Sequence, residues 1–95
     1  MTPMYAVELA FSDDPARLAL RPGHREHLAG LVADGRLLAA GPWSDDTGSL
    51  LLFLVDTREE LDDLLAADPY YASPGTTMAV HEWDPVIRKP VLDGL

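Results

Sequence analysis

The chain contains no cysteine, so neither a disulfide bond nor a thiolate metal site can stabilise it. Basic residues are also scarce, because 7 Lys and Arg stand against 16 Asp and Glu, which gives a net charge of -9. Such a surface disfavours binding to a nucleic-acid backbone or to an anionic membrane, since both depend on Lys and Arg. We therefore expect neither nucleic acid nor membrane among its partners.

Long hydrophobic runs and export signals are missing as well. The longest unbroken apolar run, Leu50 to Val55, is far too short to span a bilayer. The opening Met-Thr-Pro-Met lacks the basic stretch and apolar run of a secretion signal, so we expect a cytoplasmic protein. The 95 residues, 47% of them hydrophobic, predict a single globular domain over residues 1–95.

Hydrophobic periodicity predicts six elements in the order βαββαβ. We place the start of the first helix at Pro22, because proline is best tolerated in a first turn, and its end before Gly35, which suits the left-handed stop position. Thr57 and Glu60 stand at capping-box spacing at the start of the second helix. The expected strands cover 4–11, 36–43, 49–55 and 76–86, and the expected helices cover 22–34 and 57 to just before 69.

This order is typical of the α+β, ferredoxin-like fold, a four-stranded antiparallel sheet with two helices on one face. Two helices cover only one face of such a sheet. Yet the stretch from Leu50 to Val55 is apolar without alternation, which is typical of a strand buried on both faces. We therefore predict a homodimer that packs sheet to sheet across the open face.

The segment from Arg21 to His27 gathers two arginines and two histidines in an otherwise acidic chain. At a helix start, the backbone N–H groups and the helix dipole favour a bound anion, so a small carboxylate or phenolate would suit this corner. The alternative is that these charges only solvate the surface and balance nearby acids.

His24 lies on the backward extension of an apolar helical row formed by Leu28, Leu31 and Val32. A histidine on such a face is either a core residue with satisfied nitrogens or a proton-transfer group. His27, three residues on, is placed to share a metal with His24, but no third ligand has a diagnostic spacing. We predict neither a metal nor a cofactor.

Asp68 precedes Pro69 at the end of the second predicted helix. Turn chemistry alone explains Asp-Pro there, but an acid near a helix C-terminus opposes the dipole. We infer that this carboxylate meets a charge elsewhere, with an imidazole as the obvious partner. The aromatic residues that follow either line a pocket or fill the interface between sheets, and we favour the structural role: Tyr70, Tyr71, His81 and Trp83.

Several short motifs resemble the YciI-like, or YCII-related, family in order and spacing. They are Arg21-Pro-x-His24, Asp34-Gly35-Arg36-Leu37-Leu38, Ala40-Gly41-Pro42 and Ala67-Asp68-Pro69-Tyr70. The resemblance spans most of the chain and implies a ferredoxin-like fold that forms a dimeric α+β barrel. It also implies an active-site His–Asp pair at His24 and Asp68. The residues that it implies around a substrate-binding pocket are Arg21, Gly41, Pro42 and Tyr70.

Most members of that family have no assigned reaction, and one branch acts as a dehydrochlorinase on chlorinated hydroxyquinols. The tight turn from Ser44 to Gly48, where other members carry longer loops, prevents a substrate from being carried over. The sequence and the resemblance together predict a cofactor-independent lyase or isomerase for a small, cyclic, anionic molecule, in which His24 moves a proton and Asp68 orients it. The alternatives are a non-catalytic module that senses or carries a small metabolite, and a purely structural dimerising domain.

Overall fold

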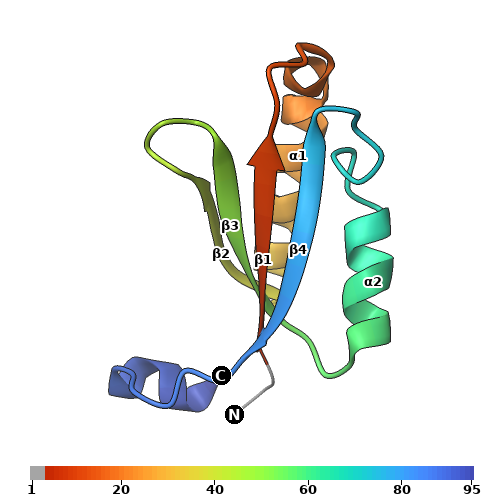
Figure 1. Cartoon of the computed structure of the whole chain (residues 1–95). Coiled ribbons are helices and arrows are strands. Elements are labelled where there is room, and N and C mark those ends of the chain that lie inside the picture. The colour runs from red at the N-terminus through yellow and green to blue at the C-terminus, as the bar shows by residue number, and fades with distance from the viewer. Residues whose placement is uncertain (1–3) are drawn as a thin grey trace.

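The computed structural model describes residues 4–95 as a four-stranded antiparallel sheet with two helices on one of its faces (Figure 1). The strands lie in the order β2-β3-β1-β4, so that β1 and β3 are central. The predicted α+β class and βαββαβ order are confirmed. In chain order the elements are β1 (Met4–Phe11), α1 (Ala16–Ala33), β2 (Leu37–Pro42), β3 (Gly48–Leu54), α2 (Arg58–Ala66), β4 (Thr76–Trp83) and the 3-10 helix η1 (Pro90–Gly94).

The hydrophobic core lies between the sheet and the two helices. Alternate residues of the central strands point toward the helices, since side chains of a strand alternate between its faces. On β1 these are Tyr5, Val7 and Leu9, and on β3 they include Leu51 and Phe53, all of them buried. The helices contribute apolar stripes at helical spacing to the same cluster: Leu28 and Leu31 from α1, and Leu61, Leu64 and Leu65 from α2.

The first helix begins at Ala16 and runs through Pro22, so its predicted start at Pro22 is wrong. The true start is fixed by Asp14, whose carboxylate accepts a hydrogen bond of 2.9 Å from the N–H of Ala16. Pro22 cannot donate to the carbonyl four residues earlier, which costs about 3 kcal/mol in a helix interior. Packing of apolar residues against the core on both sides of the proline, Leu20 before it and Leu28 after it, holds the helix together across it.

This longer helix changes where His24 lies. His24 sits in the middle of α1, whereas the sequence places it near the helix start. The free N–H groups and the positive end of the dipole are confined to the first turn. The predicted anion site at the helix N-terminus is therefore wrong, and any anion near Arg21 is attracted by side chains alone.

Other element ends follow from local chemistry. Gly35 has φ 78 and ends α1 as predicted, and the Thr57 hydroxyl accepts a 3.1 Å hydrogen bond from the N–H of Glu60 at the start of α2. Val32 is 50% exposed, so the predicted buried row of α1 does not include it. The last strand stops at Trp83 and not at residue 86, because a proline that cannot donate to a ladder follows at position 85.

The face of the sheet opposite the helices is open (Figure 1). Leu50, Leu52 and Leu54 alternate with the core residues of β3 and remain only partly buried on this face. The neighbouring strands β1 and β4 add Glu8 and His81 to this face. His81 Nε2 lies 3.7 Å from Glu8 Oε1, and both side chains are 58% exposed. No helix within residues 4–95 has the length and apolar character needed to cross a membrane.

Candidate active site

A pocket of about 370 Å³ lies between α1 and the β2–β3 side of the sheet. This volume is at the small end of the range for ligand pockets, which suits a molecule the size of one ring with substituents. The residues that the resemblance implies around a pocket all line it, together with His24: Arg21, Gly41, Pro42 and Tyr70. Asp68 is not part of the lining and lies behind the imidazole of His24.

The structure brings His24 and Asp68 into direct contact. The Nδ1 atom of His24 lies 2.7 Å from Oδ1 and 2.8 Å from Oδ2 of Asp68. Both residues are buried, with exposed fractions of 6% and 3%. An ionised carboxylate only accepts hydrogen bonds, so Nδ1 carries the proton and a neutral ring has its lone pair on Nε2. Nε2 makes no hydrogen bond to the protein within residues 4–95, which leaves it for a ligand in the pocket.

A tight turn after α2 fixes the carboxylate of Asp68. Its Oδ1 atom accepts a second hydrogen bond, of 2.9 Å, from the backbone N–H of Tyr70. The Asp68 carbonyl accepts another, of 2.9 Å, from the N–H of Tyr71. This arrangement is an Asx turn, in which Asp before Pro69 is favoured. The two sequence interpretations of Asp68 are thus combined, because one carboxylate serves both the turn and the imidazole.

Aromatic rings hold the imidazole in its plane. Tyr70 is 2% exposed, and its ring stacks on that of His24 with centroids 3.8 Å apart and an interplanar angle of 7°. Phe11 meets Tyr70 edge to face, with centroids 5.8 Å apart. The guanidinium of Arg17 lies over Phe11, 3.9 Å from the ring centroid. The stack therefore links His24 to a cation at the other end of the pocket.

The turn between β2 and β3 brings a carboxylate to the mouth of the pocket. Arg21 Nη2 donates a 3.2 Å hydrogen bond to Asp46, and the Tyr70 side chain, followed by Asp46, raises the pKa of Arg21 despite partial desolvation. Asp46 has φ 58, a left-handed conformation that Asp tolerates. Beside it, the Thr47 hydroxyl and N–H donate to Asp45 at 2.6 and 3.1 Å, which lowers the pKa of Asp45 and orders the turn.

Among the polar side chains of the lining, three were not singled out from the sequence: Arg17, Asp46 and Ser49. Arg17 had a usable signal, because residues 17, 21, 24 and 28 share one helical face once the helix is extended back to residue 16. The sequence also contained a signal for Ser49, since Ser49 lies two residues before Leu51 on β3 and so on the same, core-facing side of the strand. For Asp46 the local sequence predicts a polar turn but no partner.

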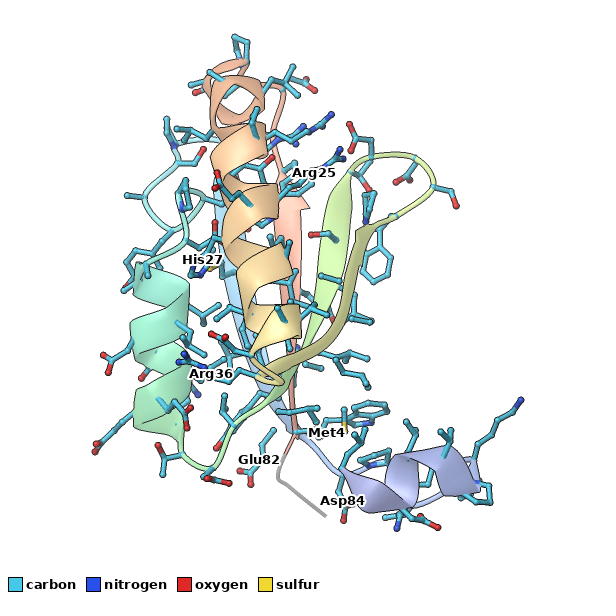
Figure 2. All side chains as sticks on the ribbon, turned by 180° about the vertical axis from the view of Figure 1, so that it is seen from behind. Met4, Arg25, His27, Arg36, Glu82 and Asp84 are labelled. Carbon is cyan, nitrogen blue, oxygen red and sulfur yellow. The ribbon has the colours of Figure 1, made fainter. Side chains whose placement is uncertain are left out.

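The other residues singled out from the sequence divide between the pocket and the rest of the molecule. His27 and Arg25 leave α1 on different sides, His27 toward α2 and Arg25 toward the β2–β3 turn (Figure 2); Arg25 lines the pocket, whereas His27 does not. His27 Nε2 donates to the carbonyl of Leu64 at 3.0 Å and so joins the two helices. Tyr71 is 56% exposed, and Trp83 lies on the open face of the sheet. In the part of the chain that the structure describes, no three His, Asp or Glu residues are arranged to hold a metal ion.

Comparison with known proteins identifies relatives in sequence and in fold. The model of the YCII-related domain matches residues 3–84. The uncharacterized protein YjpA of Bacillus subtilis (strain 168) is 39% identical over 61 residues, which are 64% of this chain and 72% of YjpA. A solved structure, 5-chloro-2-hydroxyhydroquinone dehydrochlorinase (TftG) from Burkholderia phenoliruptrix AC1100 in complex with 2,5-dihydroxybenzoquinone, is similar with a TM-score of 0.71. Sequence identity to TftG is 19%, over 85% of this chain and 93% of TftG, so the likeness is one of fold.

Proposed function

The chain belongs to the YCII-related domain family, and from this premise we propose that its pocket is an active site in which His24 transfers a proton and Asp68 orients the imidazole. The observation that carries the proposal is the buried pair, with Nδ1 of His24 2.7 Å from the Asp68 carboxylate. It leaves Nε2 directed to the pocket as a base of fixed orientation. A fixed base beside a cavity of ligand size favours catalysis over simple carriage.

The proposed reaction begins at a C–H bond next to a carbonyl or enol of the bound molecule. Nε2 of His24 accepts the proton, the electron pair of the C–H bond passes into the carbonyl group, and an enolate forms. The Asp68 carboxylate stabilises the imidazolium that results. In an isomerisation the proton returns to another carbon. In an elimination the enolate electrons expel an anionic leaving group, as in the loss of chloride that the name of TftG describes.

The charges around the pocket favour an anionic molecule. The chain carries only 7 basic residues at a net charge of -9, yet the lining includes Arg17, Arg21 and Arg25. Positive side chains concentrated in one concave site attract anions even when the protein as a whole is negative. The supported substrate is therefore a small cyclic acid or enol that is ionised at neutral pH.

Exchange of carbon-bound hydrogen for deuterium tests this function whatever the final product is. The protein is incubated in D₂O with a panel of cyclic enols, hydroxyquinones and keto acids, and deuterium uptake is followed by NMR. We expect protein-dependent uptake at an acidic carbon of at least one class. Binding of these compounds without exchange or turnover of any of them would overturn catalysis and favour the carrier or sensor.

The open face of the sheet supports a second proposal, that the chain acts as a homodimer. Leu50, Leu52 and Leu54 form an apolar row there that neither helix covers. At the end of β4, Trp83 is 42% exposed on the same face. A second copy of the same sheet would remove these side chains from water.

A charge placed in this row tests the dimer. Leu52→Glu is expected to raise the dissociation constant at least about tenfold, because an unpaired carboxylate would be buried between the sheets. Analytical ultracentrifugation measures the constant. Leu18→Glu is the control, since Leu18 is 50% exposed on α1, away from the sheet face. A parent protein that sediments as a monomer, or equal constants for both variants, would overturn the dimer.

A further inference from the structure

Arg17 is a buried cation whose charge is poorly matched within its own chain. The residue is 6% exposed, and its Nε and Nη1 atoms have no hydrogen-bond partner within residues 4–95. The carboxylate nearest to it in an ion pair, that of Asp46, is 3.9 Å from Nη2 and is itself 55% exposed. Only the ring of Phe11 offers close compensation, through a cation–π contact.

Folding alone gives no reason for this arrangement. A guanidinium is always ionised, and burying it without hydrogen-bonded partners is unfavourable. Apolar residues of similar volume in place of a buried ion are often neutral or stabilising. A buried arginine at this position therefore points to a partner that is not part of the chain.

Ser49 lines the same pocket and is likewise a buried polar residue, 5% exposed, whose hydroxyl oxygen has no hydrogen-bond partner in the described part of the chain. It occupies a core-facing position on β3, opposite Leu9 of β1 and Pro42 of β2. The pocket thus holds a buried hydroxyl and a buried guanidinium, both of which can donate hydrogen bonds to an anionic oxygen.

We propose that Arg17, Arg21 and Ser49 form a binding subsite for an ionised oxygen group of the ligand, a carboxylate or an enolate. Asp46 competes for this subsite in the free protein, because its carboxylate is 3.2 Å from Arg21 and 3.9 Å from Arg17. The assignment of this anion to the substrate rests on the proposed function. The binding of an anion by these residues does not.

The spacing along α1 indicates the size of the ligand. Arg17, Arg21 and His24 lie on one helical face and line one pocket. At a rise of about 1.5 Å per residue, Arg21 is about 4.5 Å and Arg17 about 10 Å from His24 along the axis. A single ring with an ionised oxygen at one side would reach the arginines while a carbon at its other side lies near Nε2. Hydroxyquinones and aromatic carboxylates have this form.

Two variants with opposite expected effects test the subsite by isothermal titration calorimetry. The probes are 2,5-dihydroxybenzoquinone and benzoate, with benzamide as a neutral counterpart that should bind alike in all variants. Arg17→Met is expected to weaken binding of the anionic probes about ten- to a hundredfold, because charged hydrogen bonds are lost. Asp46→Asn is expected to strengthen binding of the same probes about two- to fivefold, because an exposed ion pair that competes with the ligand is removed.

Matched controls separate local contacts from net charge. Arg36 and Asp34 form an exposed ion pair at 3.2 Å, and neither residue lines the pocket. Arg36→Ala and Asp34→Asn make the same changes in net charge as the two test variants. Both controls should bind the anionic probes within about twofold of the parent protein, since exposed charges outside the pocket are screened by water and salt.

Stability distinguishes a binding role of Arg17 from a structural one. If the arginine is kept for an anion, Arg17→Met should unfold at the same or a higher temperature. A marked loss of stability, unchanged affinity in Arg17→Met, weaker binding in Asp46→Asn, or no binding of either anion to the parent would each overturn the subsite. Failure of Arg17→Met to fold counts as such a loss of stability. Binding is measured without turnover, so absence of deuterium exchange would overturn the proposed function and leave this test intact.

Discussion

Replacing His24 by glutamine is expected to lower the rate of deuterium exchange, or of turnover of the substrate it identifies, by about 10²- to 10⁴-fold. Glutamine is close in length and its amide N–H can donate to Asp68, so the buried carboxylate keeps a partner. The amide nitrogen has no basic lone pair and cannot accept the proton. The loss should therefore fall on the rate constant with little change in stability, as followed by NMR and by thermal unfolding.

His81→Gln is the matched control for this variant. His81 lies on the open face of the sheet, 58% exposed and beside Glu8, and does not line the pocket. Its replacement should leave exchange within about twofold of the parent, because it removes a histidine that has no access to the ligand. Exchange in His24→Gln within threefold of the parent rate would contradict the role assigned to His24.

Replacing Asp68 by alanine is expected to lower the free energy of unfolding by about 3 kcal/mol at neutral pH. The carboxylate is 3% exposed and accepts from His24 Nδ1 and from the N–H of Tyr70, so alanine leaves two buried donors without an acceptor. Asp68→Asn should lose about half as much, since its amide oxygen still accepts from Tyr70. Urea denaturation measures both changes.

An exposed ion pair provides the control for the stability change. Arg58 Nε lies 2.9 Å from Asp62 on the solvent side of α2, with both side chains more than half exposed. Asp62→Ala should cost about 0.5 kcal/mol or less, because exposed pairs four residues apart contribute little. An equally small loss in Asp68→Ala would mean that the His24–Asp68 contact does not hold the site together.

The fold could be predicted from the sequence because its determinants are mostly local. Periodicity set the order of elements, Gly35 ended the first helix, and Thr57 capped the second. The start of the first helix was misplaced because Pro22 was given its usual local preference. Packing of α1 on the sheet outweighs that preference, and no local pattern reports such packing.

The residues of the candidate site also divide into those with a local sequence signal and those that only the tertiary structure brings together. Local patterns drew attention to Asp68, a carboxylate near a helix end, and to His24, which extends an apolar row, but their assignment as a pair came from the family resemblance. The contact of Arg21 with Asp46 joins residues 25 positions apart through the β2–β3 turn, which only the tertiary structure places beside α1. Arg17 was missed through the misplaced helix start, so a single wrong boundary concealed the buried cation.

The most direct test of the central claim is an NMR measurement of the ring nitrogens of His24, through long-range correlations between ¹⁵N and carbon-bound hydrogens. At a pH where the ring is neutral, we expect the proton on Nδ1 and the lone pair on Nε2, the form that the 2.7 Å contact with Asp68 requires. His24→Gln identifies the signals, and Asp68→Asn should shift them. A neutral His24 with its proton on Nε2, or signals unaffected by Asp68→Asn, would contradict a catalytic pair built from these two residues.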